Sequence, residues 1–285
     1  MAKTASLVAA TLAAWHLCLS PAHALSNRAW VSGHGTDAAS CGAPAEPCRS
    51  LQYVHNNIIA AGGEIDVLDP AGFGPVTITK ALSIVNDGVG VAGVQQATSG
   101  ANAITVNAGS TDIVTLRGLN IDGLNAGQSG IAVNSVGAIQ IVNCVIRHFT
   151  LAGVSYEVTS SPPVQMIIAD SILSDNGGYG IFIQMLNGGP ITQPAEVNKV
   201  TLTNNGTGIF VGYTAVIISN SEIANNNTGV STELGAGVRL AKDVIFGNTT
   251  GVNLSGGTVY SYGDNYIDLN TTDITGGSLT SVSTR

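Results

Sequence analysis

Short apolar stretches separated by polar and glycine-rich segments recur along most of this chain. They lie in short pieces of three or four residues, rich in residues that favour β-strands, at 200–202, 216–218 and 243–246, with similar pieces further upstream. Alternation of apolar and polar positions dominates, which is typical of β-strands, and the 3.6-residue spacing of an amphipathic helix is absent from this region. The pattern predicts many short strands joined by tight turns.

A repeat underlies this pattern, because a glycine followed by an apolar residue returns after steps of 23, 27, 28, 21 and 22 residues. The glycines concerned are Gly130, Gly153, Gly180, Gly208, Gly229 and Gly251. An asparagine precedes each of the last three by three positions, and the series extends one step further: Asn205, Asn226, Asn248 and Asn270. A repeat of this length that holds two or three strands and no helix is one turn of a parallel β-solenoid.

We therefore expect an all-β fold in which residues 64–285 form a single-stranded parallel β-helix of roughly eight turns, each of 21–28 residues. Asparagines at the same corner of successive turns can pass a hydrogen bond from one side-chain amide to the next, as side-chain ladders do in cross-β stacks. The spacing predicts such a ladder along one corner.

One segment, 50–60, is predicted to be helical. Ser50 can cap its N-terminus, and the glycine pair 62–63 would end it. Its apolar residues fall on one face: Leu51, Val54 and Ile58. A solenoid exposes apolar side chains at its ends unless a cap covers them. We expect residues 25–63 to form an N-terminal cap over the first turn.

The first 24 residues have the features of a signal peptide. Lys3 gives a positive start, residues 7–19 are almost entirely apolar, and Ala22-His23-Ala24 has the small-x-small form of a cleavage site. We expect cleavage near Ala24 and a secreted or periplasmic mature protein. No later stretch is apolar over the roughly 18 residues that a membrane span requires.

Two cysteines, Cys41 and Cys48, bracket a short loop, and in an oxidising compartment they are predicted to form a disulfide. A zinc site would need two further ligands nearby, and His34 and His55 stand at spacings that match no common zinc pattern. The remaining cysteine of the mature chain, Cys144, lies in an apolar stretch and is predicted to be a buried free thiol.

The composition narrows the classes of partner. Charged residues make up 10% of the chain, and the net charge is −8 with 10 Lys and Arg against 18 Asp and Glu. Nucleic-acid affinity depends on clustered basic residues, so we expect no nucleic-acid partner. The 36 glycines fit the many tight turns. No ligand cluster predicts a Ca²⁺ site, and no cofactor is expected.

Several motifs follow one another in a characteristic order before the repeated turns. They are Trp30-Val31-Ser32-Gly33, Pro47-Cys48-Arg49-Ser50-Leu51-Gln52, Gly62-Gly63-Glu64-Ile65 and Ile78-Thr79-Lys80. In this order the chain resembles the secreted bacterial right-handed parallel β-helix proteins of the pectate-lyase-like (pectin lyase fold) superfamily. The resemblance implies a right-handed coil. It implies no single activity, because this fold hosts lyases, hydrolases, epimerases, phage spikes and adhesins.

Alternation along the Gly-apolar strands places Phe182 and Phe210 on the outer face of neighbouring turns. Two outward phenyl rings would make a flat apolar platform on which sugars stack, with Glu157, Gln184 and Glu233 placed to bond hydroxyl groups. The leading hypothesis is that this face binds a polysaccharide or a cell-surface glycan. An equally weighted alternative is that the insertions at 161–163 and 186–191 fold over the rings.

Catalysis on this face is disfavoured. Lyases of the superfamily use an Arg or Lys base beside acidic calcium ligands, and the outward rows contain no Arg, Lys or Asp. Glu157 and Glu233 fall three turns apart, or about 14 Å by the spacing of the turns. Paired glycosidase carboxylates lie roughly 5–10 Å apart.

The catalytic candidates are Glu157 and a group on the strands after the corner, where Asp122 and Arg147 should be neighbours with His148 adjacent. A histidine beside a carboxylate can act as an acid or base near neutral pH. The alternative is a surface ion pair with little energetic weight. Three hypotheses stay open: a glycan-binding module, a carbohydrate-active lyase, hydrolase or epimerase, and a structural or adhesive surface protein.

Overall fold

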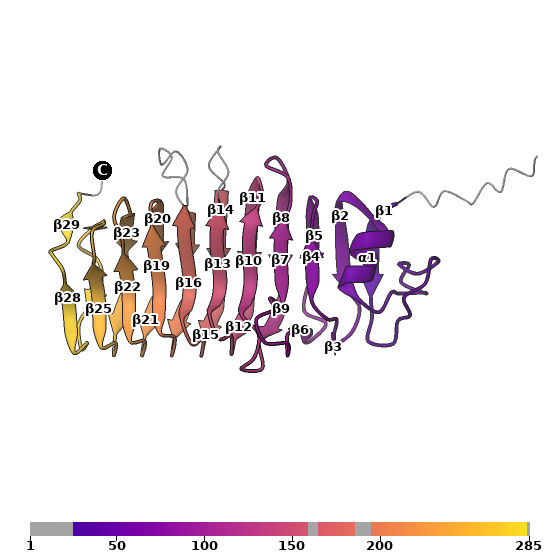
Figure 1. Ribbon diagram of the computed structural model, residues 1–285, viewed down its shortest axis with the longest axis horizontal. Coiled ribbons are helices and arrows are strands. Elements are labelled where there is room, and N and C mark those ends of the chain that lie inside the picture. Colours follow the sequence, from indigo (N-terminus) through magenta and orange to yellow (C-terminus); the bar gives the residue numbers. More distant parts are fainter. Residues whose placement is uncertain (1–24, 159–164, 186–194, 284–285) are drawn as a thin grey trace, which may run out of the picture.

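The computed structural model describes residues 25–158, 165–185 and 195–283, and within them the chain forms an elongated parallel β-solenoid whose three sheets hold 11, nine and nine strands (Figure 1). Each complete turn contributes one strand to each of three sheets, here called sheets I, II and III. Along the chain, a strand of sheet I is followed by a strand of sheet III and then by a strand of sheet II. Neighbouring strands within every sheet pair in parallel. The predicted all-β solenoid is confirmed.

The strands are short and stack in register. Sheet I consists of β1 (Ser26–Val31), β2 (Ile59–Val67), β5 (Leu82–Val85), β8 (Ile113–Arg117), β11 (Ala138–Val142), β14 (Gln165–Ala169), β17 (Ala195–Asn198), β20 (Ala215–Ser219), β23 (Gly237–Ala241), β26 (Thr258–Ser261) and β29 (Thr280–Ser281). Sheet II consists of β4 (Val76–Ile78), β7 (Ile104–Asn107), β10 (Ser129–Ser135), β13 (Ala152–Val158), β16 (Tyr179–Met185), β19 (Thr207–Gly212), β22 (Thr228–Thr232), β25 (Thr250–Leu254) and β28 (Thr272–Thr275). Sheet III consists of β3 (Ala71–Gly72), β6 (Ala92–Gln95), β9 (Leu119–Asp122), β12 (Val145–Arg147), β15 (Ile172–Ser174), β18 (Thr201–Thr203), β21 (Glu222–Ala224), β24 (Val244–Phe246) and β27 (Tyr266–Ile267).

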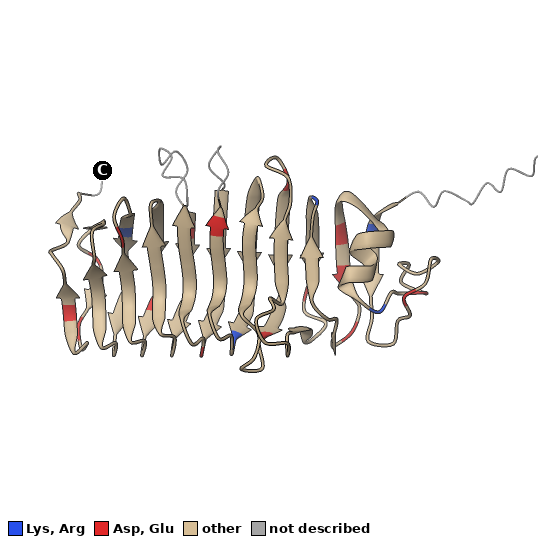
Figure 2. Cartoon of the chain, viewed as in Figure 1, with Lys and Arg blue, Asp and Glu red and all other residues tan. Residues whose placement is uncertain are grey.

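The core is a column of aliphatic side chains inside the coil. The apolar residue after each repeated glycine pairs with its counterpart in the next turn, and all six are fully buried: Ile131, Val154, Ile181, Ile209, Val230 and Val252. Burial of each such side chain contributes about 1.5–3 kcal/mol. Charged residues are correspondingly few along the strands and more frequent around the N-terminal cap (Figure 2).

Residues 25–63, for which we keep the name N-terminal cap, contain helix α1 (Leu51–Asn57), and this helix is shorter than the predicted 50–60. Ser50 caps it as expected, because its hydroxyl accepts the backbone N–H of Tyr53. The helix ends at Asn57 and not at the glycine pair, since Ile59 is fully buried and begins β2, where it pairs with Ser26 of β1. Strand pairing with β1 therefore overrides the helical pattern at this point.

The disulfide between Cys41 and Cys48 is confirmed, with a Cα–Cα distance of 5.0 Å. It ties the loop to β1, because Cys48 N–H donates to the carbonyl of Trp30 and Ser32 N–H donates to the carbonyl of Cys48. Cys144 is a buried free thiol, also as predicted, and burial raises the pKa of its thiol to about 11.

The corner between sheets I and III explains part of the asparagine content. One residue per turn there adopts a left-handed backbone conformation, with φ between 50° and 58° at Asn143, Asp170, Lys199, Asn220 and Lys242. Asn and Asp tolerate this region better than other non-glycine residues. Three of these five positions carry Asn or Asp, and Lys occupies the other two.

The corner between sheets III and II carries the predicted asparagine ladder, and its members are buried or nearly so. Each side-chain amide nitrogen donates to the side-chain oxygen of the next asparagine at 2.9–3.2 Å. The ladder runs through Asn176, Asn205, Asn226, Asn248 and Asn270. Asn176 was not in the predicted series, because it precedes Gly180 by four positions and not by three.

Candidate functional site

The outer face of sheet II has the register that the repeat predicts. Six outward residues pair consecutively from turn to turn: Ala132, Ser155, Phe182, Phe210, Ser231 and Asn253. Phe182 on β16 and Phe210 on β19 are therefore direct neighbours, and both side chains are half-buried. The other four residues of this row are small or polar, so the two rings are its main apolar feature.

The two rings do not form the flat platform that we expected. Their planes are inclined by 9° and their centroids are 5.0 Å apart. Coplanar phenyl rings cannot approach so closely, because their edges would overlap, so the rings stack face to face along the solenoid axis. One turn separates Phe182 from Phe210, and the stack fits that spacing. The pair presents ring edges outward and forms a ridge.

A third aromatic residue, Tyr179, completes the ridge. Its ring centroid lies 4.9 Å from that of Phe182 and 5.8 Å from that of Phe210, tilted by 53° and 62°. The sequence analysis missed Tyr179 because it precedes the glycine used to align the turns. A signal was available, since the corresponding positions of later turns are all threonine: Thr207, Thr228, Thr250 and Thr272. We call Tyr179, Phe182 and Phe210 the aromatic ridge.

Polar side chains lie beside the ridge in the neighbouring outward row. Glu157, Gln184 and Gly212 pair in register on successive turns, and Glu233 follows on the next. The hydroxyl of Ser155 donates to Glu157 Oε1 at 2.9 Å. Glu157 and Glu233 thus lie three turns apart along the sheet, as the repeat predicts.

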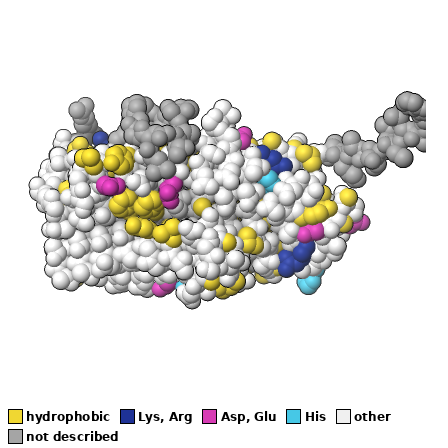
Figure 3. Space-filling view, viewed as in Figure 1, with side chains coloured by type: hydrophobic (Ala, Val, Ile, Leu, Met, Phe, Trp, Pro, Cys, Tyr) yellow, Lys and Arg dark blue, Asp and Glu magenta, His cyan; other side chains and the backbone are white. Residues whose placement is uncertain are grey.

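Gly212 lies at the centre of a small polar and aromatic group. A Cβ atom at this position would lie 3.2 Å from Glu233 Oε2, 3.4 Å from Phe210 Cε1 and 3.5 Å from Gln184 Cγ. A carboxylate, a ring edge and an amide side chain therefore converge over one residue that has no side chain of its own. Figure 3 shows hydrophobic side chains gathered over this part of the sheet with acidic side chains close by.

The electrostatic character of the face is uniform. Among the described residues, the strands of sheet II contain no Lys or Arg. Their acidic residues are Glu157 and Asp273, and Glu233 directly follows β22. The face therefore presents hydroxyl, amide and carboxylate groups around the ridge without a cation.

The second candidate group is brought together as predicted, on sheet III. Asp122 of β9 pairs with Arg147 of β12, and Asp122 Oδ2 accepts from Arg147 Nε at 3.1 Å. His148 Nδ1 lies 3.0 Å from Asp122 Oδ1. His148 has a φ of 61°, and this left-handed backbone turns the chain out of β12 at the corner. The three residues form one hydrogen-bonded group.

The carboxylate of this group is held in its charged form. Burial works to raise the pKa of Asp122, but hydrogen bonds from the Leu124 backbone, His148 and Arg147 outweigh it and lower the pKa below the ordinary value. A charged carboxylate at Nδ1 fixes the orientation of the imidazole and leaves Nε2 for another partner. This is the arrangement of an oriented acid or base, and also of a stable ion-pair network.

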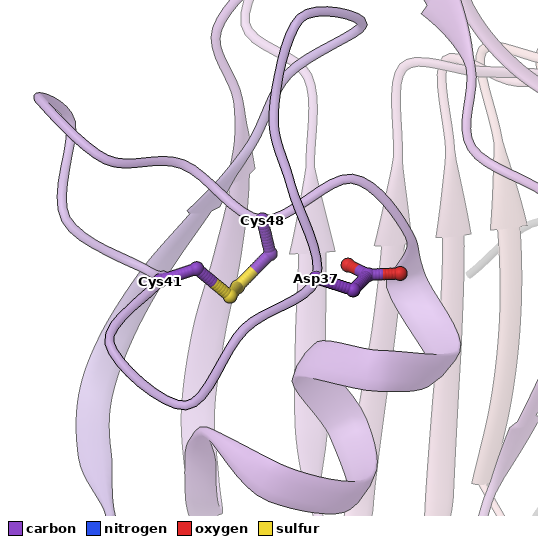
Figure 4. A group of neighbouring side chains, drawn as sticks. All are labelled: Asp37, Cys41 and Cys48. Atoms are coloured by element: carbon purple, nitrogen blue, oxygen red, sulfur yellow. A yellow bond between two sulfur atoms is a disulfide. The ribbon is translucent and has the colours of Figure 1, made fainter.

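Among the described residues, the grouping closest to a metal site is Asp37, Cys41 and Cys48 in the cap (Figure 4). It does not fit a metal, because the two sulfur atoms are joined in the disulfide. The carboxylate of Asp37 accepts hydrogen bonds from the backbone N–H of Arg49, from the backbone N–H of Ser50 and from its hydroxyl. Asp37 thus supports the start of α1.

Several sequence predictions fall on other parts of the chain. The signal segment 1–24 and the insertions at 161–163 and 186–191 lie outside the described residues. No helix in the described part of the chain is long and apolar enough to cross a membrane.

Two tyrosines near the ridge differ in environment, since Tyr156 is buried in the core and Tyr213 is 36% exposed.

Comparison with known proteins identifies the architecture. A family model described as a right-handed β-helix region matches residues 164–282. The structure is similar to that of pectate lyase Pel9A, with a TM-score of 0.62 at 14% identity over 92% of this chain and 78% of that one. It is also similar to a GH136 lacto-N-biosidase from Eubacterium ramulus, with a TM-score of 0.52 at 11% identity over 90% and 68% of the two chains. A search of curated proteins found no match to the sequence. Identities this low establish the fold alone.

Proposed function

This chain is a right-handed parallel β-helix of the pectate-lyase-like fold, and from that premise we propose that the outer face of sheet II binds a carbohydrate chain at the aromatic ridge. The observation that carries the proposal is the three-ring contact of Tyr179, Phe182 and Phe210 on an otherwise polar sheet face. Aromatic side chains with adjacent hydrogen-bonding groups are the usual composition of a sugar site.

The surroundings of the ridge support this function. Glu157, Gln184 and Glu233 provide acceptors and an amide within one or two turns of the rings. The threonine and serine positions of the later turns continue hydroxyl groups along the same face. A linear polymer aligned with the solenoid axis would meet chemically similar rows at a regular spacing of about 4.8 Å. Both solved structures with this fold described above are enzymes that act on carbohydrates, which is consistent with the proposal.

A glycan array with the full chain tests the ridge. We expect the double variant Phe182→Ala/Phe210→Ala to lose about ten-fold or more in retention, since each aromatic contact contributes about 0.5–1.5 kcal/mol. The matched control is Phe246→Ala, which removes a half-buried outward ring from β24 of sheet III. Circular dichroism should show that both variants remain folded. Equal retention of the wild type and the double variant would contradict the proposal.

A second candidate function is acid–base catalysis on a carbohydrate at Asp122, Arg147 and His148. It is favoured by one observation, the carboxylate that contacts both the guanidinium and the imidazole Nδ1. In this role the carboxylate orients His148, whose Nε2 would take or give the proton. We would incubate the protein with a panel of neutral and uronate polysaccharides and measure reducing ends and unsaturated products. Turnover that His148→Asn abolishes would support this function, because Asn retains the positive φ of this position. If no polysaccharide of the panel yields a product, the catalytic function is refuted.

A further inference from the structure

The charges around the aromatic ridge distinguish between classes of carbohydrate. We propose that the ridge selects polysaccharides that carry free, protonated amino groups and discriminates against polyuronates. This inference rests on the proposed function, since it names the substrate class of the same site.

The first argument is the sign of the local charge. Glu157 and Glu233 lie at the two ends of the row beside the rings, and no Lys or Arg stands on any strand of sheet II in the part of the chain that the structure describes. A polyuronate brings one carboxylate per sugar to this face and meets no cation there. The carboxylates of the polymer and of the two glutamates repel each other, and no cation on the described strands of sheet II offsets the repulsion. A polymer of amino sugars brings the complementary charge.

The second argument is the geometry of the ring stack. Phe182 and Phe210 turn one face toward each other, and the outer face of Phe210 is directed at the next turn, where the paired residue is Ser231. A serine side chain is too small to cover a phenyl face. An ammonium group above Ser231 would therefore lie against this ring face, which attracts cations through its quadrupole.

The carboxylate of Glu233 is placed to hold the same ammonium group. It belongs to the turn of Ser231 but leans back over Gly212, where its Oε2 is 3.2 Å from the position of a Cβ atom and Phe210 Cε1 is 3.4 Å from that position. Ring and carboxylate therefore lie close together over Gly212, which has no side chain to separate them. At the other end of the ridge, Glu157 is positioned by the hydroxyl of Ser155. Each end of the ridge thus offers a carboxylate to a cationic sugar.

Binding to three polymers of matched length tests the inference: a β-linked glucosamine polymer with free amino groups, the same polymer fully N-acetylated, and polygalacturonate. We expect the wild type to bind the free-amine polymer at least ten-fold more tightly than the N-acetylated one, and polygalacturonate weakest. The preference should fall as the salt concentration rises and as the pH passes the pKa of the sugar amine. The double variant Glu157→Gln/Glu233→Gln should lose most of the preference, about five- to ten-fold, because two exposed carboxylate–ammonium contacts are removed and each is individually weak.

Two controls separate a specific site from attraction between a polycation and an acidic protein. The variant Glu196→Gln/Glu222→Gln removes the same charge from exposed residues of sheets I and III and should leave the preference unchanged. Polylysine should bind weakly and without sensitivity to Phe182→Ala/Phe210→Ala. Equal loss in both glutamate variants, or tighter binding of the N-acetylated polymer, would overturn the inference. If the N-acetylated polymer binds through the phenylalanines without any effect of the glutamates, the inference fails while the proposed function stands.

Discussion

The side-chain amide of Asn226 donates a hydrogen bond to the side-chain oxygen of Asn248 in the following turn, at 3.0 Å. The backbone N–H of Asn226 donates to the same oxygen at 2.9 Å, and the side-chain oxygen of Asn226 in turn accepts from the backbone and side chain of Asn205. One buried asparagine therefore satisfies polar groups of three successive turns. The ladder links turns that otherwise contact each other through apolar side chains and strand hydrogen bonds.

Replacement of Asn226 by Ala should destabilise the solenoid by about 2–6 kcal/mol. The change leaves the backbone N–H of Asn205 and the carbonyl of Leu202 without these buried partners, and each unsatisfied buried group costs about 1–3 kcal/mol. The side-chain amide of Asn205 keeps its bond to the carbonyl of Leu173. Urea and thermal unfolding would measure the loss. Asn227→Ala is the control, because Asn227 is exposed and its backbone bond to Asn205 is retained. Equal stability of the two variants would refute a structural role for the ladder.

The sequence predicted this architecture in detail because the repeat itself sets the register. Counting from each glycine placed Phe182 beside Phe210 and Asp122 beside Arg147, and both pairings are found. Two features of the structure could not be predicted, because they depend on side-chain torsions and on contacts between segments far apart in the sequence. The face-to-face stack of the rings follows from rotamers that spacing does not encode. The early end of α1 follows from the pairing of Ile59 with β1, a contact between segments 33 residues apart (59 − 26).

Loss of the disulfide should destabilise the cap more than the solenoid. Cys41 and Cys48 are seven positions apart, and closure of so short a loop contributes roughly 2.5 kcal/mol in the chain-entropy model. Because Cys48 also pairs with β1, the variant Cys41→Ser/Cys48→Ser should increase hydrogen exchange and proteolysis in residues 25–58. The asparagine corner at 205–248 serves as the internal reference and should keep its protection. A uniform loss along the whole chain would show that the cap and the solenoid unfold together.

Acid should destabilise the N-terminal cap, because it protonates His55. Its Nε2 accepts the backbone N–H of Thr79 at 3.1 Å, so the imidazole is neutral with its proton on Nδ1, next to Asn56 Oδ1. Burial, together with the nearby charge of Lys80, lowers the pKa of His55 below 6.5. A depressed histidine pKa contributes stability above the unfolded pKa, and that stability is lost as the pH falls from 6.5 through the folded value.

Hydrogen exchange at the amide of Thr79 between pH 7.5 and pH 5 measures this effect. We expect faster opening at the lower pH in the wild type and a flatter response in His55→Gln, whose amide oxygen can accept the same N–H without titrating. His34→Gln is the matched control, since His34 is exposed in the cap loop. If the His34 variant flattens the response as much as the His55 variant, the buried imidazole is not its source.

Asp243, which lies toward the C-terminal end of the solenoid, should make the stability depend on pH in the opposite direction, so that stability falls as the pH rises. It is fully buried at the corner between sheets I and III, where its carboxyl oxygens accept the backbone N–H of Ser221 at 2.9 Å and of Ala241 at 3.0 Å. Burial raises its pKa to about 7, and those two hydrogen bonds only partly oppose the shift. A carboxyl group with a raised folded pKa favours folding in its protonated form. Its contribution is therefore complete near pH 4 and lost as the pH rises through about 7.

Unfolding measured from pH 4 to pH 8 should show this loss, and Asp243→Asn should remove it, because an amide does not titrate. The expected contribution is a few kcal/mol, since each pKa unit corresponds to about 1.4 kcal/mol. Asp170→Asn is the matched control: it lies at the same corner in another turn, is exposed, and stands in a column where Asn143 and Asn220 already adopt the same positive φ. That control should leave the profile unchanged. A wild-type curve that rises steadily to pH 8 would mean that the folded Asp243 is ionised well below neutrality.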